Sequence, residues 1–161
     1  MKIRHIYISP GHNFYGHHEK PPGENPEVEV DQVECVAGKG LAGDRFFGYK
    51  EDYKGQLTLF SWEVYLEACE AFHIDPDETP PSVFRRNIIV EGMDLNALIG
   101  KEFELQGVTL SGSEEASPCY WMNQAFADGA HDWLKGRGGL RARILTDGVL
   151  RTENAVDPAV A

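Results

Sequence analysis

Apolar residues alternate with polar ones, or form runs of three or four, over several short stretches of this chain, as β-strands with a buried face do. The stretches lie at residues 3–8, 28–35, 56–60, 88–90, 103–105, 108–110, 140–144 and 149–151. The parity of the apolar positions flips across Gln106-Gly107, which predicts a tight hairpin. A change of parity near Asp31-Gln32 predicts a bulge within the strand at 28–35.

Two longer segments have the three- and four-residue spacing of helices. Ser61 is a suitable N-cap for a helix over residues 62–72, and residues 120–134 show similar spacing with a break near their middle. Short strands, tight turns and two or three short helices predict a mainly β fold with a barrel-like architecture. We expect a single domain that spans residues 1–161.

The amino-acid composition limits the class of protein and the molecules that it can bind. A hydrophobic content of 42% fits a folded chain, and no apolar run reaches the roughly 20 residues of a membrane span. The formal charge of −11 argues against binding to nucleic acid or an anionic membrane, which depends on clustered lysine and arginine. Three widely spaced cysteines and the lack of a signal peptide predict a reducing, cytoplasmic location.

One cysteine follows a proline, between a polar loop and a segment with helical spacing. Pro118 restricts its own backbone and that of Ser117, so we expect this corner to present Cys119 to solvent. A thiolate attacks electrophiles, carries sulfur or binds soft metals, whereas a core position is the alternative for a lone cysteine. Cys35 and Cys69 fall on apolar faces, and we expect both in the core.

Several of the few basic residues lie beside turns. They are Lys39, Arg45, Arg85, Arg86, Arg137, Arg141 and Arg143. Because guanidinium binds phosphate and carboxylate through two parallel bonds, this group favours an anionic small-molecule ligand; neutralisation of the abundant carboxylates is the alternative. Glu114 and Glu115 would oppose thiolate formation if they lay close to Cys119.

Three histidines lie in a loop rich in glycine and proline at residues 11–27. They are His12, His17 and His18. Imidazole and thiolate bind zinc, so a zinc or other transition-metal site here, with or without Cys119, is a second hypothesis. Solvated loop histidines are the simpler explanation, because the spacing is not that of a helical metal motif.

Four ordered segments resemble the MOSC domain, the C-terminal domain of molybdenum-cofactor sulfurases, which also occurs as small stand-alone proteins. The segments are residues 40–45, 86–100, 117–119 and 136–145. The resemblance is strongest over residues 28–150 and rests on the order of the four segments, since no single one is specific.

The resemblance implies a MOSC-type β-barrel-like fold, a bound molybdenum–molybdopterin cofactor, and a cysteine, matching Cys119, that carries sulfur or ligates molybdenum. The cofactor would be bound by the residues that match the family motifs. These are Gly43, Asp44, Arg45, Arg86, Asn87 and Arg137. We expect Cys119 to converge in space with the three arginines and Asn87 of this set.

The resemblance also implies sulfur transfer or a cofactor-dependent reduction, and some members with additional domains reduce N-hydroxylated compounds. Sulfurases generate their sulfur in a pyridoxal-phosphate domain that 161 residues cannot include, so we expect a sulfur donor or redox partner protein. Glu153-Asn154 replaces a frequent Gly-Asp pair, and Ala116-Ser117 stands where a second cysteine often lies, which excludes a dithiol mechanism there. A non-catalytic interaction module is the third hypothesis.

Overall fold

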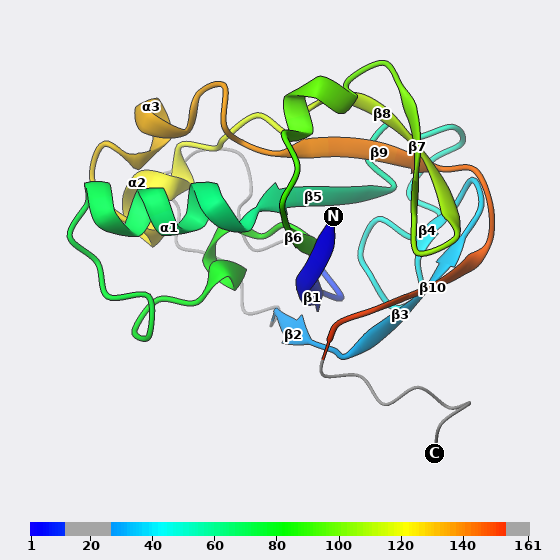
Figure 1. Ribbon diagram of the computed structural model, residues 1–161, viewed down its shortest axis with the longest axis horizontal. Helices are drawn as coiled ribbons and strands as arrows, with labels where there is room; N and C mark the ends of the chain where they lie inside the picture. Colours follow the sequence, from blue (N-terminus) through cyan, green and yellow to red (C-terminus); the bar gives the residue numbers. More distant parts are fainter. Residues whose placement is uncertain (12–26, 154–161) are drawn as a thin grey trace.

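The computed structural model describes residues 1–11 and 27–153, which form ten strands, three α-helices and two 3₁₀ helices (Figure 1). The strands are β1 (Lys2–Ile8), β2 (Val28–Glu29), β3 (Gln32–Val36), β4 (Gly40–Leu41), β5 (Leu57–Ser61), β6 (Ile88–Glu91), β7 (Glu102–Leu105), β8 (Val108–Glu115), β9 (Leu140–Ile144) and β10 (Gly148–Arg151). The helices are α1 (Trp62–Ala71), α2 (Trp121–Ala125) and α3 (Ala130–Leu134), with the 3₁₀ helices η1 (Pro81–Phe84) and η2 (Leu95–Leu98).

The strands form two sheets. Seven strands pair in the order β2-β1-β6-β5-β9-β8-β7, and the other three pair in the order β10-β3-β4. In Figure 1 the three α-helices gather at one end of the large sheet and the small sheet lies toward the other end. Neither sheet closes on itself within the described residues, so the mainly β fold with three short helices is confirmed and the barrel-like architecture is not.

The buried side chains form two groups. The first is drawn from both sheets and includes Val33, Leu59 and Leu110. The second lies against the helices, where Cys69 of α1 and Leu134 of α3 pack with aromatic side chains from the sheet. Cys35 and Cys69 are 0% and 2% exposed, as their apolar faces predict.

Local signals account for several boundaries. The Ser61 hydroxyl accepts a hydrogen bond from the Val64 N–H at 3.1 Å, and α1 begins directly after it. Gln106 and Gly107 have φ values of 50° and 84°, the left-handed conformation that a two-residue hairpin between β7 and β8 requires.

The expected bulge at Asp31-Gln32 is wrong. β2 pairs with β1 in the large sheet, whereas β3 pairs with β10 and β4 in the small sheet. The change of parity therefore marks the point where the chain passes from one sheet to the other. None of the helices in the described part of the chain is long and apolar enough to cross a membrane.

Candidate functional site

A pocket of about 280 Å³ opens between the turns that follow β4, the start of β6 and the segment from β8 to α2. Its apolar wall combines Phe46, Tyr53, Phe60, Phe84, Trp121, Met122 and Leu134. Its polar wall holds Cys119 and four arginines, Arg45, Arg85, Arg86 and Arg141. Among residues 1–11 and 27–153, no aspartate or glutamate lines it.

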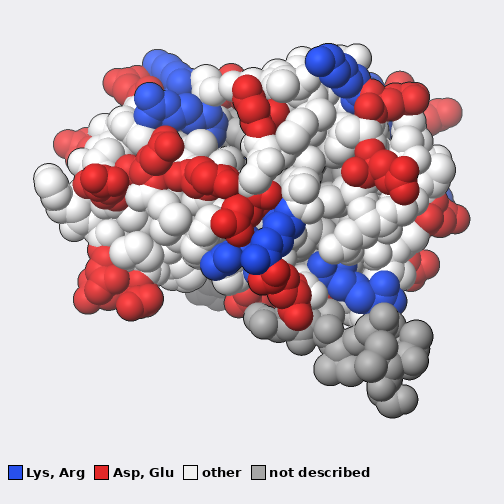
Figure 2. Space-filling view, in the orientation of Figure 1, with Lys and Arg blue, Asp and Glu red and all other residues white. Residues whose placement is uncertain are grey.

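The pocket lining is positively charged, whereas the chain as a whole has a formal charge of −11. Figure 2 shows carboxylates spread over the face in view, with lysine and arginine side chains between them. Four guanidinium groups around one cavity therefore concentrate positive charge in an otherwise acidic molecule. Such a cavity favours a ligand with negative charge.

Cys119 is the exposed thiol of the pocket. It lies in the connection between β8 and α2, and its carbonyl accepts a hydrogen bond from the Met122 N–H at 2.9 Å. The other two cysteines are buried, and burial raises the pKa of Cys35 to about 12 and also raises that of Cys69. Since the thiolate is the reactive form, Cys119 is the cysteine placed for chemistry.

Arg86 holds the Cys119 segment through its main chain. Its Nη2 donates to the carbonyls of Ala116 and Ser117 at 3.1 and 3.2 Å, and its Nε donates to the Gly138 carbonyl at 3.0 Å. Burial, together with the positive charges of Arg141 and Arg45, lowers the pKa of Arg86 to about 10. Arg86 is thus a cross-brace between two loops at the edge of the pocket.

The second of these loops, residues 136–139, approaches the Cys119 segment closely because it carries glycine. A Cβ at Gly138 would overlap the Ala116 carbonyl oxygen. A Glu115 carboxylate oxygen accepts from the N–H groups of Gly136 and Gly138 at 3.1 and 3.4 Å. Glu115 and Arg86 therefore join the same two loops, and the Glu115 carboxylate is used in that contact.

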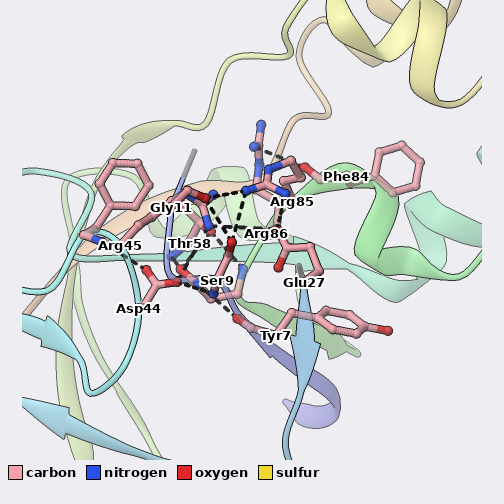
Figure 3. A network of polar contacts seen from close by, with 12 residues as sticks. Tyr7, Ser9, Gly11, Glu27, Asp44, Arg45, Thr58, Phe84, Arg85 and Arg86 are labelled. Atoms are coloured by element: carbon pink, nitrogen blue, oxygen red, sulfur yellow. Dashed lines mark hydrogen bonds and ion pairs between the residues drawn. The ribbon is translucent and has the colours of Figure 1, made fainter. Parts of the chain in front are cut away.

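Arg45 and Arg85 share a carboxylate that lies behind the pocket lining (Figure 3). Oε1 of Glu27 is 3.1 Å from Nη1 of Arg85 and 3.9 Å from Nη1 of Arg45. Arg85 has a left-handed backbone, with φ of 54°, an uncommon conformation for a residue with a side chain. Arg45 also packs over the Phe46 ring, 4.9 Å from its centroid.

Arg141 completes the ring of arginines. Its Nη1 is 3.4 Å from Oε1 of Glu114, which also pairs with Lys54 at 2.9 Å. The Glu114 carboxylate is thus balanced by two cations, and these pairs lower its pKa. The opposition to thiolate formation expected from Glu114 is offset in this way.

Comparison with known proteins identifies the family. The family model described as the MOSC domain matches residues 43–157. This chain belongs to the MOSC domain family. No curated protein sequence matches it significantly.

Solved structures share the fold of this MOSC domain. The YuaD protein from Bacillus subtilis superposes with a TM-score of 0.70 at 18% identity, over 94% of this chain and 91% of that one. YiiM from Escherichia coli gives 0.65 at 18% identity, over 95% and 67% of the two chains. YiiM from Geobacillus stearothermophilus gives 0.64 at 14% identity, over 93% and 70%. At these identities the likeness concerns the fold.

Of the residues that match the family motifs, three line the pocket of this MOSC domain: Arg45, Arg86 and Cys119. Arg137 does not line it, and lies instead over the Trp133 ring, 4.2 Å from the centroid, beside a separate depression. The structure therefore brings together two of the three expected arginines with the cysteine.

The remaining motif residues support the pocket from behind. Asn87 is 4% exposed, accepts from the Thr58 N–H at 3.0 Å and donates to the Tyr7 carbonyl at 3.1 Å. Asp44 accepts from the N–H groups of Ser9 and Phe46 at 3.0 and 3.3 Å. Gly43 takes φ of 86° in the turn before it.

The three histidines of the zinc hypothesis, His12, His17 and His18, lie outside the described residues. Within the described part, no group of three or more histidine, cysteine, aspartate or glutamate side chains is arranged to hold a metal ion.

The family motifs did not single out two of the pocket arginines or the carboxylate behind them. Arg85 and Arg141 belonged to the set of basic residues beside turns, but nothing in the chain order distinguished them from Arg143 or Lys39. Glu27 gave no signal, since it lies 18 residues before Arg45 at the end of a loop without periodicity.

Proposed function

We propose that this protein binds the molybdenum–molybdopterin cofactor in the pocket of Cys119 and the four arginines, and that Cys119 ligates the metal or carries sulfur. The observation that carries the proposal is the placement of an exposed thiol in a cavity lined by four guanidinium groups and by no acidic residue among those described. Membership of the MOSC family gives the cofactor its identity.

The polar wall fits the phosphate of such a cofactor. The Arg45 side chain is only 9% exposed. Its Nε is buried and has no hydrogen-bond partner among the described residues. A buried donor without a partner is uncommon in proteins, and a bound phosphate oxygen would satisfy it. Arg45 and Arg85 are therefore the proposed phosphate ligands.

The thiol fits the metal. Thiolate is a soft ligand that suits a metal already held by sulfur donors. Over residues 1–11 and 27–153 no cluster of metal-ligating side chains accompanies Cys119, which suits a cofactor that brings its own ligands. When bound, the cofactor supplies the electron-transfer capacity that this chain's side chains lack. The apolar wall, with Phe46 and Phe84, would pack against the flat pterin.

The partners follow from the same site. The proposal includes a sulfur donor or a redox partner protein, since no pyridoxal phosphate chemistry is assigned to this chain. It includes a cytoplasmic location and excludes nucleic acid and membrane as partners, because the abundant carboxylates would repel phosphate backbones and anionic lipids.

The test is to load the purified protein with molybdopterin cofactor and to measure molybdenum and pterin, with zinc as a competitor. Wild type is expected to retain both. Cys119→Ser is expected to lose most of the molybdenum while the arginines retain part of the pterin. Ser111→Ala, which removes a hydroxyl from a residue of β8 that does not line the pocket, is the matched control and should behave as wild type.

Iodoacetamide provides the independent readout. In the native protein it should modify Cys119 and leave the buried Cys35 and Cys69 unmodified, and prior modification should block molybdenum retention. Retention of zinc alone, insensitive to Cys119→Ser, would replace this proposal with the histidine hypothesis. Retention of neither metal nor pterin would overturn it.

A further inference from the structure

Glu27 lies against the pocket without lining it. Its carboxylate is 12% exposed and sits between Arg45 and Arg85, both of which face the cavity (Figure 3). An anion bound by these two arginines would therefore approach a buried negative charge. The same guanidinium groups would serve both the ligand and the protein's own carboxylate.

The pairing of Glu27 with the arginines is incomplete. Its Oε1 is buried and makes no hydrogen bond among the described residues, and the same holds for Nε of Arg45. The two arginines are also held by other partners: Arg85 Nη2 donates to the Gly11 carbonyl at 3.0 Å, and Arg45 Nη1 is 3.7 Å from the Asp44 carboxylate. Among the described residues, Oε1 of Glu27 is thus attracted by the charge of the two arginines without being fixed by a hydrogen bond.

The groups that face Glu27 make its negative charge easy to lose. Burial raises its pKa, Arg85 and Arg45 lower it, Asp44 raises it, and the net direction is upward. Tyr7 of β1 lies close enough that Glu27 contributes to the raised pKa of its phenol, although burial is the main cause. A second negative charge on the arginines would raise the Glu27 pKa further.

We infer that Glu27 sets the affinity of the pocket for anions: it competes with the ligand for Arg45 and Arg85, and its carboxylate takes up protons from solvent when a doubly charged anion binds. The inference rests on the proposed function in that it assigns the ligand's anionic end to these two arginines. The ligand class is a compact oxyanion with two negative charges, such as a phosphate monoester. Glu27 is therefore a specificity-determining residue rather than a ligand.

The probe for this inference is sulfate, because its charge stays constant between pH 5 and pH 8 and any pH dependence belongs to the protein. Sulfate affinity is measured by titration calorimetry at both ends of this range, in two buffers with different ionisation enthalpies. The difference in heat between the buffers gives the number of protons taken up. All proteins carry Cys119→Ser, so that the thiol does not titrate.

Glu27→Gln keeps the size of the side chain and removes its charge. At pH 8 it is expected to bind sulfate about tenfold more tightly than its parent, because a unit charge a few ångströms from the ligand has been removed. Its affinity should change little with pH and its binding should take up no proton. The parent should bind more tightly as pH falls, and should take up a fraction of a proton at pH 8.

Two further variants keep the inference falsifiable. Glu29→Gln is the matched control: it lies in the adjacent strand, pairs with His5 rather than with a pocket arginine, and should leave sulfate binding as in the parent. Glu27→Asp retains the charge and should retain proton uptake, which excludes a general loosening of the loop as the cause.

The possible outcomes distinguish a failure of the Glu27 inference from a failure of the proposed anion site. If parent and Glu27→Gln bind sulfate equally, with no proton uptake in either, this inference is wrong and the proposed cofactor site stands. If neither binds sulfate at millimolar concentrations while both are folded, the arginines are not an anion site, and the inference and the phosphate-binding part of the proposed function fall together.

Discussion

The adjacent arginines between η1 and β6, Arg85 and Arg86, use their guanidinium groups in different ways. Arg86 donates to main-chain carbonyls of two loops, whereas Arg85 pairs with a carboxylate that it shares with Arg45. The carbonyl partners of Arg86 belong to the backbone and cannot change their charge. Glu27 can be protonated, and a bound anion can compete with it.

This difference divides the pocket into a rigid part and an adjustable part. Around Cys119, the main chain is braced by Arg86 and Glu115, both of which bond to main-chain groups of the neighbouring loop segments. At the end of the pocket that carries Arg45 and Arg85, Nε of Arg45 and Oε1 of Glu27 are buried and have no hydrogen-bond partner among the described residues. The thiol is therefore held in place before any ligand arrives, and the affinity for the ligand is set elsewhere.

The strongest test of the rigid part is Arg86→Met, which keeps an unbranched apolar side chain and removes the guanidinium donors. We expect the free energy of unfolding to fall by about 3 kcal/mol, because the carbonyls of Ala116 and Gly138 lose their partner in partly buried positions. Denaturant unfolding measures the loss. Arg137→Met, at an exposed arginine over Trp133, should lose less than about 1 kcal/mol; equal losses would contradict a bracing role.

A smaller loss is expected when the close approach of the two loops is opened. Gly138→Ala should lower the free energy of unfolding by about 2 kcal/mol, because its Cβ would overlap a carbonyl oxygen and force the loops apart. Gly136→Ala has open space around its Cβ but a φ of 81°, so it should lose about 1 kcal/mol from backbone strain. Gly136→Ala as the more damaging of the two would refute the overlap argument.

The smallest expected effect is that of a substitution in the adjustable part of the pocket. It should change the affinity for sulfate rather than the free energy of unfolding. Arg45→Lys keeps the positive charge beside Glu27 and removes Nε, so sulfate affinity should fall about tenfold, the equivalent of about 1.4 kcal/mol, with the loss of one charge-assisted hydrogen bond. Calorimetry measures it. Arg137→Lys, outside the pocket, is the control, and an identical effect in both variants would mean that sulfate is not bound at Arg45.

Much of the fold was predictable because local chemistry decides it. A hydroxyl that caps a helix at Ser61 and a glycine that permits the turn at Gly107 act within a few residues of themselves. The transition at Asp31-Gln32 was mistaken for a bulge because parity records a change of face and carries no information about which strand lies alongside. Closure of a sheet likewise depends on pairing between strands distant in the chain.

The site was predictable only as far as its segments. The order of the family motifs identified the loops of Arg45, Arg86 and Cys119, and these loops do meet. The order of the motifs did not distinguish side chains that face the cavity from those beside them. Arg137 belongs to a motif, yet its guanidinium lies on the Trp133 ring. Gly138 of the same loop allows the close approach of the Cys119 segment. The position of Glu27 beside Arg45 and Arg85 could not be predicted from the sequence, because it arises from contacts between distant segments.

The Cys119 loop is anchored through carbonyl oxygens, which every amino acid possesses, and the hydroxyl of Ser117 has no part in that anchoring. Ser117 is exposed, so the loop would keep its course if another side chain stood there. A cysteine introduced at this position would bring a second thiol beside Cys119 on an unchanged scaffold. The chain thus offers a ready site for installing the two-thiol chemistry that it lacks.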